Sequence, residues 1–346
     1  MNVFGHCKCL VVPRYHAAAR EWPGHVGICE VLTHHRLDVW WQRCGRRAAV
    51  SRLGVGLLAA CAAGPWPAAR AADGPALITL VEGAALVIDG ARSMQAAAGL
   101  RLGAATLIET SPTSQLLRVE FADGSMLDLG PDSKAMVLPP GLAGASPRAP
   151  AFYLLQGWAK HSSAGAAKPG GLLSHAAEGM QATGTTVSRV TGDGLQLFVE
   201  TGTLQLLERR IKAPNTLTLK AGEFYARDGA DKGQVSPRPT AGFLPSVPRA
   251  FRDTIPSRAA ALKGGRVEPK PAPMPGYAAL KAWLAAEPVI RREFPRRFIT
   301  LAKDAAFRDG LVKNLSAHPE WEPILFPKPP ASSPSTPYLR PDSPRS

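Results

Sequence analysis

Residues 116–130 read LLRVEFADGSMLDLG, and this pattern decides the fold class. In an extended chain Leu117, Val119 and Phe121 lie on one face, because successive side chains of a strand point to opposite sides. Asp123-Gly124 then predicts a two-residue hairpin turn, since glycine reaches the positive φ that such turns require. The stretch is therefore typical of two antiparallel strands that share one apolar face.

The return strand continues this face through Leu127 and Leu129, while Arg118 and Glu120 point to the other side. A second hairpin is predicted over residues 181–207, where apolar residues alternate after the turn sequence TGDG and Thr201-Gly202 is expected to close toward another strand. Short strand patterns recur at intervals of roughly 8 to 12 residues, which favours a mainly β fold of short stacked strands, solenoid or sandwich-like.

Several segments carry a family resemblance. VEGAALVIDGA, LRLGAATLIET and VEFADGSMLDLGPDSKAMV resemble successive parts of the FecR domain family. FYLLQGWAKH, ATGTTVSRV, LQLFVETGTLQLL and LKAGEFYARDG resemble its second half, so the similarity covers about residues 76–228. The resemblance implies a periplasmic all-β domain, best known from regulators that relay the state of an outer-membrane transporter to a sigma factor. The chain departs from that layout, because no helical domain followed by a membrane span precedes the β domain.

Charge and composition predict the domain boundaries. Residues 72–235 contain 14 Lys and Arg against 15 Asp and Glu, a net charge of −1, whereas residues 236–346 contain 18 against 9, a net charge of +9. The predicted order is an over-extended or disordered N-terminus (1–42), an export signal (43–71), the FecR-like β domain (73–235), a basic Pro-rich linker (236–275), a small three-helix module (276–326) and a disordered tail (327–346).

The export signal combines four arginines between residues 43 and 52, an apolar run over residues 53–63, and Ala69-Arg70-Ala71 as an A-x-A cleavage site. Cleavage after Ala71 predicts a periplasmic protein. In the alternative interpretation, residues 58–61 (LAAC) resemble a lipobox, and a lipidated Cys61 would hold the protein on a membrane.

Helical spacing begins at Tyr277, where Leu280, Trp283 and Leu284 share one face. Pro288 starts a second helix because proline suits the first helical turn, and Asp304 is placed to cap a third. The apolar residues expected in the core from the second helix are Val289, Ile290, Phe294 and Phe298.

Residues that carry enzyme chemistry are sparse after residue 75, where the histidines are His161, His175 and His318 and cysteine is absent. We expect each histidine at the surface. The sequence has no nucleophile elbow, phosphate loop or H-E-x-x-H motif. The cysteines and histidines between residues 6 and 29 lack the paired short spacings of a zinc site. We therefore predict no enzyme activity, no cofactor and no metal.

The sequence predicts a non-catalytic periplasmic protein that acts as a binding or scaffolding module of the cell envelope. The alternative is a cell-surface signalling regulator coupled to a transporter and a sigma factor. We expect an envelope protein or a glycan such as peptidoglycan as partner, no nucleic acid because of export, and membrane contact only through a lipidated Cys61. The candidate contact residues, chosen as projecting loops, are Asp123, Gly124, Gly192, Asp193 and Gly194.

Overall fold

The computed structural model describes residues 76–139, 142, 151–165, 170–174, 179–208, 215–229, 232–262, 264–265 and 267–327. These residues belong to one compact unit, Trp66–Ser346. The predicted N-terminal segment, export signal, Cys61 and C-terminal tail lie outside the described residues, except for Pro327.

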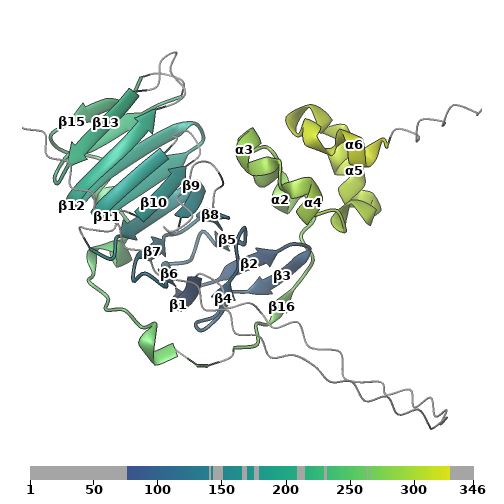
Figure 1. Ribbon diagram of the computed structural model, residues 1–346, viewed down its shortest axis with the longest axis horizontal. Coiled ribbons are helices and arrows are strands. Elements are labelled where there is room, and N and C mark those ends of the chain that lie inside the picture. Colours follow the sequence, from purple (N-terminus) through teal and green to yellow (C-terminus); the bar gives the residue numbers. More distant parts are fainter. Residues whose placement is uncertain are drawn as a thin grey trace, which may run out of the picture. The chain divides into compact units, whose positions relative to one another are not determined.

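Strands dominate the first two thirds of this unit (Figure 1). The strands that precede the centre of the sheet are β1 (Ala76–Glu82), β2 (Ala85–Asp89), β3 (Arg92–Gln95), β4 (Arg101–Leu102), β5 (Leu107–Thr110), β6 (Leu116–Phe121), β7 (Met126–Leu129) and β8 (Lys134–Val137). The later strands are β9 (Ala151–Ser162), β10 (Gly170–Ser174), β11 (Gly179–Thr191), β12 (Gly194–Glu208), β13 (Asn215–Lys220), β14 (Phe224–Arg227), β15 (Gln234–Ser236) and β16 (Pro271–Ala272).

Two branches of the sheet meet at β9. Its first half pairs with β8 and with β10, and its second half pairs with β7 and β11. One branch runs from β8 through β5, β2 and β3 to β16, and the other runs from β7 through β6 and β1 to β4. All pairings between the described strands are antiparallel except that of β9 with β10, so the predicted mainly β fold is confirmed.

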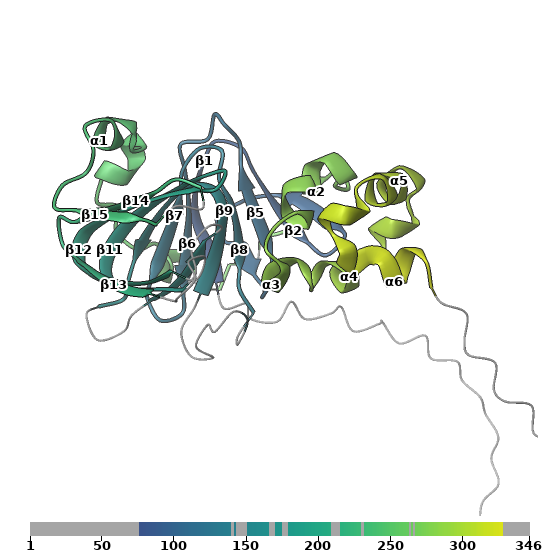
Figure 2. The same ribbon diagram turned by 90° about the horizontal axis from the view of Figure 1, so that it is seen from above.

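The sheet curls, so that strands of both branches enclose one core (Figure 2). We call the side that faces this core the inner face and the opposite side the outer face. Ile78 of β1, Val87 of β2 and Leu197 of β12 pack together on the inner face. The alternating residues of the first predicted hairpin that lie in this core are Leu117, Val119, Phe121, Leu127 and Leu129.

The second predicted hairpin is formed by β11 and β12, with one difference. We expected Thr201-Gly202 to close one strand and open another, but β12 runs without interruption from Gly194 to Glu208. Gly202 has a φ of 79° and lies opposite Gly184, and a Cβ at this position would come within 1.9 Å of Thr183 O. The glycine therefore allows the two strands to bend together where a side chain would clash.

The outer face is covered by later parts of the chain. We call residues 242–258 the strap; it contains the short helix α1 (Phe243–Ser246) and a 3-10 helix over Arg249–Arg252. Phe243 and Phe251 are buried on the outer face, and the ring centroids of Phe243 and Phe224 are 4.8 Å apart. The stretch predicted as a Pro-rich linker thus contains a segment that packs on the sheet.

Another part of the outer face is covered by the helical module. Its helices are α2 (Tyr277–Leu284), α3 (Pro288–Arg291), α4 (Phe294–Arg297), α5 (Ala305–Lys313) and α6 (Glu322–Leu325), with 3-10 turns at Leu301–Lys303, Leu315–Ala317 and Pro319–Trp321. Leu280 and Trp283 of α2 share a buried cluster with Leu107 of β5 and Tyr153 of β9. The module and the sheet therefore form one continuous apolar core on this side.

The second predicted helix is divided into α3 and α4. Pro295 lies in the first turn of α4, where proline removes a backbone donor and obstructs continuation of a preceding helix. Ile290 is buried as predicted, but Val289 is 39% exposed, so its predicted place in the core was wrong. Asp304 caps α5 as predicted, with its Oδ1 accepting from Phe307 N at 2.8 Å.

Candidate functional site

The first predicted contact, Asp123-Gly124, lies in the loop between β6 and β7. Gly124 N donates to Phe121 O at 3.0 Å and Phe121 N donates to Ser125 O at 2.9 Å, which makes a three-residue loop instead of the predicted two-residue turn. Gly124, with a φ of 87°, closes this longer loop. Asp123 Oδ1 accepts from the Ser125 backbone N at 2.9 Å and from its Oγ at 2.6 Å. The carboxylate thus stabilises its own loop.

The second predicted contact, Gly192-Asp193-Gly194, joins β11 to β12. Thr191 pairs with Gly194, so Gly192 and Asp193 form a two-residue turn. Gly192 has a φ of 54°, which suits the first position of a hairpin turn. This turn has the predicted form.

The two predicted loops lie at opposite ends of the strands. Ser162, the last residue of β9, pairs with Met126 next to the first loop. Gly157 of the same strand pairs with Val190, next to the second loop. Five residues of an extended strand span roughly 16 Å, so one small ligand cannot contact both loops. The structure therefore does not bring the candidate residues together.

A hollow of about 400 Å³ lies beside the second loop. Its volume falls in the lower part of the range that small-molecule sites occupy. Its lining comes from the β11–β12 turn, the adjoining ends of β12, β14 and β15, and the β14–β15 connection. The lining residues are Thr191, Gly194, Leu195, Gln196, Ala226, Arg227, Asp228, Lys232 and Gln234.

Strand pairing places two glutamines on either side of an alanine in this hollow. Gln196 of β12 pairs with Ala226 of β14, and Ala226 pairs with Gln234 of β15. Neighbouring strands lie about 4.8 Å apart, so the two glutamine backbones are about 10 Å apart. Ala226 itself packs against the apolar cluster that contains Phe243 on the outer face. Amide groups that both donate and accept hydrogen bonds therefore flank this part of the hollow.

The described charged residues that line the hollow are Arg227, Asp228 and Lys232. Arg227 is 4% exposed, and its guanidinium nitrogens lie below the surface. Asp228 and Lys232 are exposed at the rim. The neighbouring turn was predictable from the sequence but these three residues were not, because only the pairing of β14 with β12 and β15 brings them to the turn.

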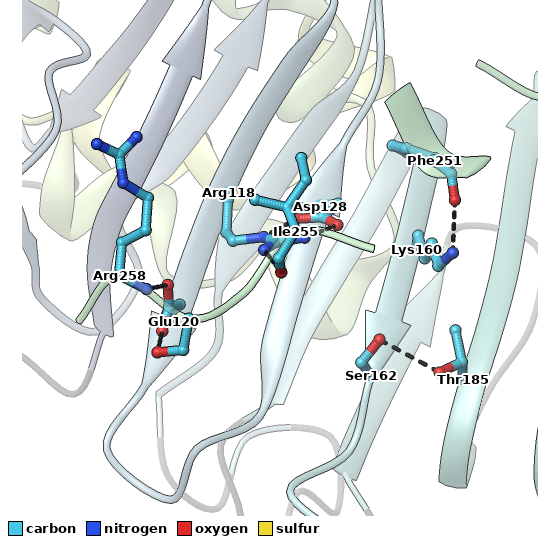
Figure 3. Close-up of polar contacts among 10 residues, drawn as sticks. Arg118, Glu120, Asp128, Lys160, Ser162, Thr185, Phe251, Ile255 and Arg258 are labelled. Carbon is cyan, nitrogen blue, oxygen red and sulfur yellow. Dashed lines mark hydrogen bonds and ion pairs between the residues drawn. The ribbon is translucent and has the colours of Figure 1, made fainter. Parts of the chain in front are cut away.

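A second group of charged residues lies on the outer face under the strap (Figure 3). Arg118 Nε and Nη2 donate to the two carboxylate oxygens of Asp128 at 2.6 and 2.7 Å, and Arg118 Nη1 donates to Ile255 O of the strap at 2.5 Å. Lys160 Nζ donates to Phe251 O at 2.5 Å and pairs with Glu200 at 2.9 Å. These charges fasten the strap to the sheet.

Glu120 also fastens the strap to the sheet, through hydrogen bonds to residues farther along the strap. Its Oε1 accepts from Arg258 N at 2.9 Å, and its Oε2 accepts from Ser257 Oγ (Figure 3). Burial raises the pKa of the Glu120 carboxyl, but several hydrogen bonds, among them those from Arg258 and Ser257, together outweigh burial and hold this pKa below its usual value. The alternating pattern correctly predicted that Arg118 and Glu120 lie on the face opposite the apolar residues. It did not predict that the strap buries this face.

Two of the histidines are buried, so the expectation that they lie at the surface was wrong. His161 is on the inner face, 5.7 Å from the Phe152 ring between centroids, and burial lowers its pKa to about 4. His318 is buried in the helical module, where its Nε2 lies 3.1 Å from Tyr277 Oη. His175 lies outside the described residues.

Within the residues that the structure describes, no three side chains of His, Cys, Asp or Glu are grouped closely enough to hold a metal ion. Within the same residues, no helix has the length and apolar content needed to cross a membrane.

Comparisons with known proteins show only a distant likeness. No model of a known protein family and no curated protein matches the sequence. Among solved structures, the chain is similar to a candidate anti-sigma factor from Parabacteroides distasonis, at 13% identity and a TM-score of 0.31. The match covers 38% of this chain and 57% of that chain, which is less than two thirds of the solved structure. A TM-score of this size carries no functional argument, so membership of the FecR domain family stays a prediction from the sequence.

Proposed function

We propose that this chain is a non-catalytic, exported binding or scaffolding protein of the bacterial cell envelope, and that its β domain recognises the partner at the hollow beside the β11–β12 turn. Export follows from the predicted signal at residues 43–71. The partner class follows from export, because an exported module meets envelope proteins and glycans.

The residues that line the hollow are the main support for this proposal. It combines two amides, one hydroxyl and charges of both signs, groups that orient a polar ligand. Hydrolytic or acyl-transfer chemistry needs a nucleophile with an adjacent base, or two carboxylates. Among the lining residues that the structure describes there is one carboxylate, Asp228, and neither His, Cys nor Ser. The hollow is therefore better suited to binding than to catalysis.

The charged residues under the strap support the same proposal. Arg118, Asp128 and Glu120 are each at most 5% exposed and are hydrogen-bonded within the protein. Groups engaged in this way stabilise the fold, and a substrate has no access to them. We therefore assign recognition of the partner to the edge of the sheet, where loops are exposed to solvent.

The basic C-terminal part contributes weaker attraction. Residues 236–346 carry a net charge of +9, and exposed Lys and Arg attract anionic polymers over about 8 Å at physiological ionic strength. This attraction should be sensitive to salt, unlike specific contacts inside the hollow.

The test is to express the full chain in a bacterium with an outer membrane, determine its intact mass and measure its co-sedimentation with purified cell-wall sacculi. We expect a mature periplasmic protein that begins near Ala72 and is retained on sacculi in part at high salt. Diacylation at Cys61 would change the proposed soluble form to a lipoprotein. If the chain binds a transporter or a sigma-factor regulator and is not retained on sacculi, the signalling alternative replaces the proposal.

A further inference from the structure

One edge of the sheet is long and open. Among the described strands, β4, β13, β15 and β16 each pair with one neighbour, and β13 is the longest of the four with six residues (Figure 1). It pairs with β12 without a register shift. We infer that this edge pairs antiparallel with β13 of a second copy of the chain. The inference goes beyond the proposed function and does not rest on it, because β13 does not line the hollow.

The other edge strands have features that oppose further pairing, and β13 lacks these features. β4 has two residues and β15 has three, and Pro237 and Pro239 follow β15. β16 begins at Pro271, which has no backbone donor. Native proteins usually protect sheet edges by shortness, proline or charge. β13 contains no proline, and its one charged residue, Lys220, stands at its end.

The backbone groups of β13 that point away from β12 belong to Thr216 and Thr218. Thr203 of β12 lies opposite Lys220, but Thr203 N donates to a threonine hydroxyl of β11 at 3.1 Å, and Lys220 N donates to Glu223 Oε2 at 2.7 Å. These opposite residues therefore form a non-hydrogen-bonded pair, and such pairs alternate with hydrogen-bonded pairs along an antiparallel ladder. By this alternation the N–H and C=O groups of Thr216 and Thr218 point outward from the sheet edge.

A register centred on Leu217 uses all of these outward groups. Thr216 then lies opposite Thr218 of the second copy, and Thr218 lies opposite Thr216 of the second copy, which gives about four backbone hydrogen bonds. The threonine side chains meet on the outer face, where cross-strand Thr–Thr pairs stabilise a sheet. Both threonines are exposed in the single chain and accessible to the second copy.

Leu217 favours a second copy as the occupant of this edge. It is only partly buried against the core of the inner face, whereas Leu219 on the same face is 0% exposed. In this register Leu217 meets Leu217 of the second copy in a non-hydrogen-bonded pair, the closer kind, so each side chain covers the other. The two copies of Lys220 lie roughly 20 Å apart along the strands, beyond the Debye length of about 8 Å, so their repulsion is screened.

Analytical ultracentrifugation of the full chain over about 1 to 100 µM tests the pairing, because small interfaces are weak. We expect a monomer–dimer equilibrium in the wild type. Thr218→Pro removes one outward donor from each copy and should raise the dimer dissociation constant about tenfold or more. Thr218→Val is the matched control, since it keeps the backbone donor and the β-branched shape, and its constant should stay within about twofold of the wild-type value. Circular dichroism verifies that both variants fold.

Disulfide trapping tests the register without relying on the fold of Thr218→Pro. Leu217→Cys places the two introduced thiols on the symmetry axis, where Cα atoms about 4.5 Å apart permit a disulfide. Thr218→Cys places its two thiols two positions out of register and should cross-link about tenfold more slowly. Peptide mass spectrometry identifies the bond between the introduced thiols.

Three results would overturn the inference. The first is a wild type that stays monomeric, in which case a strand of another protein is the remaining occupant for this edge. The second is the same dissociation constant in Thr218→Pro and Thr218→Val, which would place the dimer contact elsewhere. The third is equal cross-linking at positions 217 and 218, which would contradict the register.

Discussion

Arg118 of β6 and Asp128 of β7 lie directly opposite each other and form a two-point ion pair that the strap covers. The side chains are 5% and 7% exposed. The hydrogen bond to Asp128 raises the pKa of Arg118 despite its burial. Since the remaining terminal nitrogen of Arg118 donates to Ile255 O, this pair connects the first hairpin to a segment more than a hundred residues later.

We predict that Asp128→Ala lowers the free energy of unfolding by about 3–5 kcal/mol, because it leaves the Arg118 charge buried without its carboxylate. Urea denaturation followed by circular dichroism measures this change. The double variant Arg118→Met with Asp128→Leu should recover most of the loss, since it removes both charges and keeps apolar volume. A loss below about 1 kcal/mol in Asp128→Ala would show that the pair is solvated and that the strap does not cover it.

Trp283 provides a test of how the helical module is joined to the sheet. Its ring is buried in the shared cluster, and its Nε1 donates to Glu109 Oε1 of β5 at 2.6 Å. Trp283→Ala should cost about 3–5 kcal/mol, and the described unit should still unfold in one cooperative transition. Val289→Ala, at an exposed position of α3, is the control and should change stability by less than about 0.5 kcal/mol. Two separate transitions in the wild-type chain would contradict the shared core.

His161 should make stability depend on pH. Burial lowers its pKa to about 4, below the usual value of 6.5, although the nearby Asp123 carboxylate opposes part of this shift. The folded state therefore binds fewer protons than the unfolded state between these pKa values, so stability falls as pH falls through this window. We expect the wild type to lose about 2 kcal/mol more than His161→Leu between pH 7 and pH 4.5. Equal losses in the two proteins would mean that His161 can be protonated in the fold.

The local β pattern was predictable because it depends on neighbours in sequence. Alternation at Leu117, Val119 and Phe121 predicted which side chains enter the core, and Asp304 was recognisable as a helix cap. The burial of Arg118 was not predictable, because the covering residue Ile255 lies far away in the chain. Proline-rich composition favoured a linker, and it gave no information on the packing of the strap.

The candidate site was predictable only in part for the same reason. The β11–β12 turn was visible as TGDG, but Lys232 reaches it through strand pairings that join β12, β14 and β15. The contrast of charge between residues 72–235 and 236–346 predicted a boundary between two domains. The shared clusters around Phe243 and Trp283 instead require experiments on the full chain, since a fragment would expose these faces.

Hydrogen exchange of the full chain, measured by mass spectrometry with and without solubilised cell-wall fragments, tests the central claim most directly. If the β domain recognises its partner at the hollow, exchange should slow over residues 191–196 and 226–234, and it should change little over the helical module at residues 277–325. The slowing should persist at high salt and be weaker in Lys232→Gln than in the control Lys220→Gln, whose lysine is exposed on β13 and does not line the hollow. Slowing confined to residues 277–325, or equal slowing in both variants, would contradict recognition at the hollow.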